Sequence, residues 1–188
     1  TTFTSQINDA IAAIDYVQTL DGIDPERIGL IGLSQGGLVA ASVAGRDPRV
    51  DSVVLWSAAA NPTANFPGLT GQEAFLEGLN NPEGVAFTTP WGEETELGQA
   101  FFLDIYNVDP VAELSRYAGP VMAIGGLRDT TVWPQPFVSQ LFLNNHEGPE
   151  MLVAVDGDHI FDVLTPEAGA TVLDDVIAWS IAWLQQSF

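Results

Sequence analysis

Residues 27–44 read RIGLIGLSQGGLVAASVA, and this stretch decides the fold of the chain. An apolar run at 28–33 precedes Ser34, and small and apolar residues with helical spacing follow it. The pattern predicts a strand, a sharp turn and a helix, with Gly32 and Gly36 allowing strand and helix to approach each other. Such a turn strains the serine backbone and lifts its hydroxyl above the sheet. Ser34 is therefore the candidate nucleophile, and the alternative interpretation is an ordinary turn with a serine N-cap.

Further apolar runs alternate with helical patterns along the chain. We expect strands at 50–58, 120–126 and 150–155 besides 28–33, and helices at 5–20, 36–46, 107–117, 134–144 and 168–186. This alternation indicates βαβ units, and continuous apolar strands indicate a sheet covered on both faces. The fold class is therefore α/β, a mostly parallel sheet with helices on both faces, with ligands expected at the carboxyl ends of the strands.

The interval from 61 to 106 interrupts this alternation. It is rich in Asn, Pro, Gly and Phe, and two short strand-like pieces at 84–88 and 94–97 flank Pro90-Trp91-Gly92. We expect a β-hairpin here and interpret the interval as a lid or cap insertion. The predicted organisation is one domain, with its core in residues 1–60 and 107–188 and the insertion at 61–106.

The charge balance of the chain is extreme. Its 188 residues include 25 acidic residues, five arginines and no lysine, which gives a net charge of −20. Because 46% of the residues are hydrophobic, we attribute the charge to a folded surface and not to disorder. Such a surface repels itself unless salt screens it, so we expect a protein from a salt-adapted organism; an acidic protein without salt adaptation is the alternative. Nucleic acid and anionic membrane surfaces are excluded as partners, because both would be repelled.

The sequence contains no cysteine, no apolar stretch of transmembrane length and no recognisable signal peptide at Thr1. We therefore expect neither a disulfide nor a thiolate site. A cytoplasmic location is favoured.

A serine hydroxyl needs a general base, and the chain has two histidines. His146 lies in the polar segment 144–149, where we expect a solvated surface residue. His159 follows the predicted strand 150–155, at the edge where the carboxyl ends of parallel strands meet. We therefore predict that His159 is the base for Ser34.

The acid that orients the histidine is expected at the end of a neighbouring strand. Asp129 comes shortly after such a strand, so its carboxylate can reach the imidazole. Asp156 and Asp158 are closer to His159 in sequence and remain alternatives, but proximity along the chain does not orient a side chain. Asp158 can also serve as a helix N-cap or a turn carboxylate. We favour Asp129.

Three segments carry a family resemblance. GLSQG at 32–36, GGLRDTTVWP at 125–134 and GDHIF at 157–161 occur in the order serine, acid, histidine and resemble the α/β-hydrolase superfamily over essentially the whole chain. The hairpin-bearing interval, followed by LGQAFFLD at 97–104 and Asp109-Pro110, is similar to bacterial cinnamoyl and feruloyl esterases and to their dienelactone hydrolase and acylaminoacyl peptidase relatives.

The resemblance implies a serine carboxylic ester hydrolase that acts through an acyl-enzyme on a small-molecule ester. Ser34 would attack the ester carbonyl, His159 would act as base and then as acid, and Asp129 would orient the imidazole. The backbone N–H of Gln35 would supply one oxyanion donor. Neither a metal nor an organic cofactor is implied.

Three aromatic residues are candidates for substrate contacts: Trp91, Phe102 and Trp133. Phe102 stands near the place of a lid tyrosine that binds the phenolic group of the substrate in some cinnamoyl esterases. Two alternatives to the esterase stay open. One is a peptidase of the acylaminoacyl or dipeptidyl type, and the other is a catalytically impaired hydrolase fold that serves as an assembly module.

The resemblance also implies that part of the family fold is absent from this sequence. The family sheet has eight strands, four of them before the strand that carries the nucleophile, whereas one helix precedes that strand here. We therefore expect roughly 60 to 80 residues of the family fold to be absent, either because the chain is a fragment of a complete enzyme or because a second copy completes a minimal hydrolase. The loop that supplies the second oxyanion donor is absent with them, which implies a loss in turnover on the order of 10² to 10³. The strand at 28–33 would then form an apolar edge, and we expect it to pair with a second copy in a homodimer.

Overall fold

The computed structural model describes residues 1–165 and 169–188. Its centre is a four-stranded parallel sheet in the order β1-β2-β5-β6. The strands are β1 (Ile28–Leu33), β2 (Val50–Trp56), β5 (Val121–Gly126) and β6 (Glu150–Val155). All four strands expected from the apolar runs are therefore present. Because they are parallel, their carboxyl ends meet at one edge of the sheet, as the predicted site requires.

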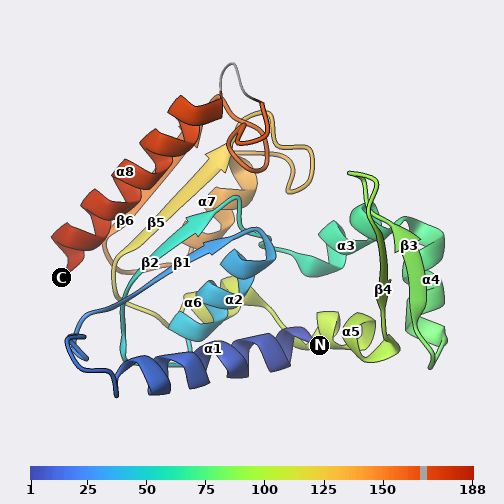
Figure 1. Ribbon diagram of the computed structural model, residues 1–188, viewed down its shortest axis with the longest axis horizontal. Coiled ribbons are helices and arrows are strands. Elements are labelled where there is room, and N and C mark those ends of the chain that lie inside the picture. The colour runs from blue at the N-terminus through green and yellow to red at the C-terminus, as the bar shows by residue number, and fades with distance from the viewer. Residues whose placement is uncertain (166–168) are drawn as a thin grey trace.

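Helices cover both faces of this sheet (Figure 1). They are α1 (Phe3–Val17), α2 (Gln35–Ala44), α6 (Pro110–Leu114), α7 (Phe137–Leu143) and α8 (Gly169–Ser187). Helix α8 packs on one face, over a cluster that includes Val54, Met122 and Val176. Helices α2, α6 and α7 lie on the other face, with α1 packed against α2. The structure confirms the predicted α/β class. Within the described residues, no helix has both the length and the apolar character that crossing a membrane would require.

The position of a strand in the sheet decides how far it is buried. All six residues of β5 are buried, because strands flank it on both sides and helices cover both faces. β1 and β6 are the edge strands, and they leave Ile31, Leu33 and Met151 exposed. The expectation that every strand is covered on both faces is therefore wrong at the edges. Pairing of the free edge of β1 with a second copy stays a prediction.

Capping residues explain why two helices begin elsewhere than their apolar periodicity suggests. Helix α1 begins two residues early, because Thr2 and Ser5 form a capping box in which Ser5 N donates to Thr2 Oγ1 over 3.1 Å. Helix α6 is shorter than the expected 107–117. Asp109 caps it with its side chain, and Pro110 occupies its first turn.

The segment between β2 and α6 contains the predicted hairpin and three helices that the sequence pattern did not predict. The hairpin pairs β3 (Val85–Thr88) antiparallel with β4 (Glu94–Leu97). The helices are α3 (Pro62–Thr70), α4 (Gln72–Asn80) and α5 (Gln99–Asp104), followed by a short 3-10 helix (Ile105–Asn107). Figure 1 shows these elements, in green shades, gathered at one end of the molecule. The role of 61–106 as a lid stays a prediction.

Aromatic packing holds α3 in place although it contains the poor helix formers Pro67 and Gly68. The ring centroid of Phe66 lies 5.4 Å from that of Phe3 in α1 and 5.2 Å from that of Phe101 in α5. These contacts join residues far apart in the sequence, so local periodicity does not predict this helix.

A carboxylate also joins α1 to α5. Asp104 Oδ2 accepts a hydrogen bond from Thr4 N at 2.6 Å, and Oδ1 accepts one from Thr4 Oγ1 at 2.8 Å. Burial alone would raise the pKa of Asp104, but these hydrogen bonds favour the charged form and hold its pKa below the ordinary value.

Candidate active site

Ser34 occupies the turn between β1 and α2 in a backbone conformation that L-residues rarely adopt. Its φ is 55° and its ψ is −119°. Neighbouring backbone holds the turn, because Ser34 N donates to Trp56 O at 2.8 Å and Ser34 O accepts from Ala59 N at 3.1 Å. The surrounding sheet therefore imposes the strained conformation that the motif predicts.

Two glycines, Gly32 and Gly37, allow close packing at this turn, and only Gly32 is one of the two that flank the serine in the motif. A Cβ on Gly32 would overlap the carbonyl of Gly36 and lie 2.7 Å from Gly37 Cα. A Cβ on Gly37 would overlap the side chain of Ala58, whereas one on Gly36 would meet nothing within 4 Å. The expectation that Gly36 is needed for the close approach is therefore wrong: β1 approaches α2 through Gly32, and Gly37 allows α2 to approach Ala58, which follows β2.

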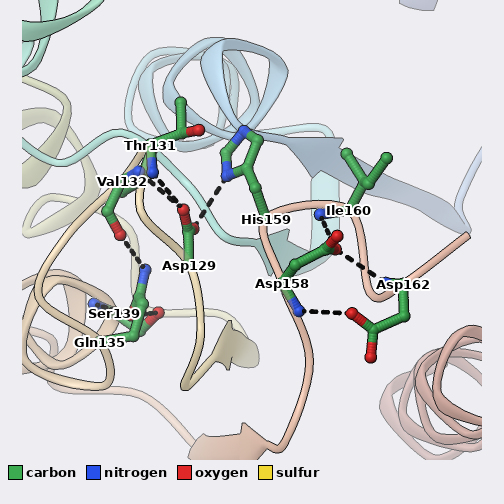
Figure 2. Close-up of polar contacts among 9 residues, drawn as sticks. All are labelled: Asp129, Thr131, Val132, Gln135, Ser139, Asp158, His159, Ile160 and Asp162. Carbon is green, nitrogen blue, oxygen red and sulfur yellow. Dashed lines mark hydrogen bonds and ion pairs between the residues drawn. The ribbon is translucent and has the colours of Figure 1, made fainter. Parts of the chain in front are cut away.

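Asp129 and His159 meet at the carboxyl ends of β5 and β6 (Figure 2). Asp129 Oδ2 lies 2.8 Å from His159 Nδ1. Its other oxygen, Oδ1, accepts hydrogen bonds from Thr131 N at 2.7 Å and from Val132 N at 2.9 Å, and the residue is 1% exposed. Since a carboxylate only accepts, Nδ1 carries a hydrogen, so in the neutral imidazole Nε2 is the nitrogen that can accept a proton.

The two competing carboxylates have other partners. Asp158 Oδ1 accepts from Ile160 N at 2.9 Å and from Asp162 N at 2.8 Å, as Figure 2 shows. Asp156 forms an ion pair with Arg128 at 2.8 Å. Neither carboxylate contacts the imidazole, so of the three candidates only Asp129 is placed to orient it.

A charged network holds the loop that carries His159. Arg128, next to Asp129 in the sequence, pairs with Asp156 and with the buried Asp162. These two carboxylates, Asp156 foremost, raise the pKa of Arg128 above its ordinary value. The network ties the loop after β5 to the loop after β6, which fixes the imidazole relative to Asp129.

Ser34 and His159 face one pocket of about 130 Å³. It lies between the turn after β1, helix α3 and the loop after β5, and it is lined by Ser34, Gln35, Ala59, Asn65, Phe66, Leu69, Trp91, Thr131, Val132 and His159. In the part of the chain that the structure describes, no hydrogen bond joins Ser34 to His159. A larger cavity of about 450 Å³ lies near Asp109 and Tyr106, and its lining contains no nucleophile paired with a base.

The role of the Gln35 backbone N–H as an oxyanion donor stays a prediction, and the position of Gln35 in the helix bears on it. Gln35 is the first residue of α2, so the helix leaves its backbone N–H without an internal partner. The Gln35 side chain has a separate partner, since its Nε2 donates to Gln6 Oε1 at 2.8 Å. An anion at Ser34 would therefore meet the amino end of α2.

Only one of the three aromatic candidates for substrate contact lines the pocket, namely Trp91. Phe102 is 0% exposed and packs edge-on against Phe75 and Phe101 in the core. Trp133 is 69% exposed and lies outside the lining. The place suggested for Phe102 by the lid resemblance is therefore wrong, because this side chain fills space between helices.

Helix α3 supplies pocket residues that the sequence pattern did not reveal, which are Asn65, Phe66 and Leu69. One local signal for this helix exists in the dipeptide Asn61-Pro62, where Asn61 is the N-cap and Pro62 opens the first turn.

His146 is not the solvated surface residue that its polar surroundings predict. Its side chain is buried and stacks against Tyr117, with ring centroids 6.1 Å apart. Nε2 donates to Gly119 O at 2.9 Å. Burial raises the pKa of Tyr117 above its ordinary value. His146 is thus a packed residue remote from Ser34, at the opposite end of the sheet strands.

Sequence comparison connects the chain to one family. The profile of the prolyl oligopeptidase family (Peptidase_S9) matches residues 3–187. The acylamino-acid-releasing enzyme of Arabidopsis thaliana is 24% identical over 130 residues, which cover 67% of this chain and 16% of that protein. The chain spans well under half the length of the curated relatives it matches.

Structure comparison gives the same fold. Est1E from Butyrivibrio proteoclasticus superposes with a TM-score of 0.69 and 21% identity, covering 94% of this chain and 72% of that one, and it has also been solved with ferulic acid bound. The α/β hydrolase GrgF from Penicillium sp. sh18 superposes with a TM-score of 0.77 and 13% identity, covering 100% of this chain and 73% of that one. These likenesses establish an α/β-hydrolase fold.

Proposed function

The chain belongs to the prolyl oligopeptidase family of serine hydrolases, and on that premise we propose that it hydrolyses carboxylic esters with short acyl groups, using Ser34, His159 and Asp129. One observation carries the proposal. The imidazole held by Asp129 at 2.8 Å shares a pocket with the serine of the strained turn. A nucleophile, a base and an orienting acid on three loops are the parts that acyl transfer needs.

The proposed reaction has two steps. Ser34 Oγ attacks the carbonyl carbon and gives its proton to His159 Nε2, while Asp129 holds the Nδ1–H tautomer. The backbone N–H of Gln35 stabilises the oxyanion. The bond to the alkoxy oxygen then breaks as that oxygen takes the proton from His159, leaving an acyl-enzyme. Water attacks the acyl-enzyme in the same way, which releases the acid and restores Ser34.

The size and lining of the pocket favour small acyl groups. A cavity of 150 Å³ holds benzene, so one of about 130 Å³ accepts a short chain or a single small ring. A cinnamoyl or feruloyl group is larger than a single small ring and would not fit in this volume. It would have to extend past Trp91, which lines the pocket and is 61% exposed. We therefore propose that short-chain esters are better substrates than hydroxycinnamate esters.

The proposal is tested by the hydrolysis of p-nitrophenyl butyrate in molar KCl. Ser34→Ala should abolish it, and Asp129→Asn should lower kcat by about 10⁴, as loss of the correct tautomer does in other triads. Asp9→Asn is the matched control, because this exposed aspartate lies on α1, and its activity should equal that of the wild type. Wild-type activity no higher than that of Ser34→Ala would refute the esterase and favour a silent fold used as an assembly module.

A second candidate is a peptidase of the acylaminoacyl type. The family match and the Arabidopsis relative favour it. Turnover of p-nitrophenyl esters and of ethyl ferulate should be compared with that of acylaminoacyl amides. Faster cleavage of the amides would replace the esterase by the peptidase.

A further inference from the structure

The pocket wall contains a polar group with no protein partner. Asn65 Oδ1 is buried and accepts no hydrogen bond from any residue that the structure describes. Asn65 lines the same pocket as Ser34 and His159. A buried amide oxygen without a partner is unfavourable, so such an atom in a pocket marks a place where a ligand can donate.

Asn65 does not serve as the capping residue of α3. The N-cap of α3 is Asn61, whose side chain accepts from Ala64 N, so Asn65 is not needed as a cap. Asparagine inside a helix is unfavourable compared with alanine or leucine. Leu69, one turn later, also lines the pocket, which places Asn65 on the face of α3 that is turned toward Ser34.

The residues around Asn65 in the pocket wall are mostly apolar. Apart from Ser34, Gln35 and His159, the lining holds two polar residues, Asn65 and Thr131, and its other members are Ala59, Phe66, Leu69, Trp91 and Val132. A donor on the acyl group would therefore meet Asn65 in apolar surroundings, where a hydrogen bond discriminates strongly between substrates with and without the donor.

We propose that Asn65 selects acyl groups that carry a hydroxyl close to the scissile carbonyl, so that short hydroxyacyl esters are the preferred substrates. This proposal rests on the proposed ester hydrolysis at Ser34. A pocket of about 130 Å³ is roughly 6 Å across, so the hydroxyl belongs on the second or third carbon of the acyl chain. An amide N–H on the acyl group would also satisfy Asn65 Oδ1, so the test includes an acyl group that carries one.

The test compares p-nitrophenyl esters of butyrate, 3-hydroxybutyrate and N-acetylglycine in the wild type and in Asn65→Leu. Leucine has nearly the shape of asparagine and lacks the acceptor. We expect the ratio of kcat/KM for 3-hydroxybutyrate to that for butyrate to fall about 10-fold in Asn65→Leu. Asn80→Leu is the matched control, because this exposed asparagine lies in the neighbouring helix α4, and it should keep the wild-type ratio.

In the ester assay, two results would overturn the proposal. One is an equal ratio in the wild type and in Asn65→Leu. The other is a preference for the N-acetylglycine ester over 3-hydroxybutyrate that depends on Asn65, since this would assign an amide in place of a hydroxyl. If no ester is cleaved faster than by Ser34→Ala, the proposed hydrolysis itself fails. Binding of 3-hydroxybutyramide and butyramide to the Ser34→Ala protein, measured by NMR titration, then decides the role of Asn65, and equal affinities refute it.

Discussion

Replacing Ser34 with glycine should make the protein more stable while removing its proposed nucleophile. The serine backbone has φ 55° and ψ −119°, and such a conformation costs a residue with a Cβ about 1–3 kcal/mol. Glycine adopts it without that cost. However, glycine also raises the conformational entropy of the unfolded chain, which reduces the gain in stability by about 0.4–1 kcal/mol. The Ser34 side chain makes no capping hydrogen bond to α2, so its removal loses none there. With both ranges taken at their middle, the net gain in unfolding free energy should be about 1.3 kcal/mol, or about 3–5 °C in Tm for a chain of this size.

The control for this prediction is Ser34→Ala, which removes the hydroxyl but keeps the Cβ and hence the strain. Its unfolding free energy should stay within about 0.5 kcal/mol of the wild type. Urea unfolding in molar KCl, followed by far-UV circular dichroism and by tryptophan fluorescence, gives the free energies and checks that the two signals coincide. If Ser34→Gly is no more stable than Ser34→Ala, the strain argument for this turn is wrong.

Three further predictions concern packing, pH and salt. Gly37→Ala should lower the unfolding free energy by about 1–3 kcal/mol, because its Cβ would overlap Ala58, whereas Gly36→Ala should be neutral or stabilising by up to about 1 kcal/mol. Equal urea midpoints for the two variants would contradict the assigned close approach. The pKa of Asp104 is lowered in the folded state, so its stabilisation is complete above the unfolded value of 3.8 and is lost as the pH falls through the folded value. Asp104→Asn should therefore be less stable than the wild type at pH 7, and the difference in urea midpoint should shrink below about pH 4; a constant difference would speak against the hydrogen bonds from Thr4. With a net charge of −20, the wild type should show a higher Tm in molar KCl than in dilute buffer, and an unchanged Tm would remove the case for salt adaptation.

Local patterns predict the parts of this fold that depend on neighbouring residues. The strand at 28–33, the turn at Ser34 and the helix after it follow from a continuous run of apolar and small residues. The hairpin around Trp91 follows from two short strand-like pieces. Helix α3 is different, because Phe66 stabilises it through rings in α1 and α5. Its own residues include a proline and a glycine that argue against a helix.

In the candidate site, too, some features follow from the local sequence and others depend on tertiary packing. The sequence by itself determines a serine in a strand-turn-helix motif, followed by an aspartate and a histidine that each come just after a strand of a parallel sheet. It does not determine which aspartate meets His159 or that His146 is buried. Nor does it determine that Asn65 lines the pocket while Phe102 is buried in the core. Only the tertiary structure decides these points. Backbone propensity acts between residues a few positions apart, whereas the orientation and burial of a side chain depend on segments brought together by packing.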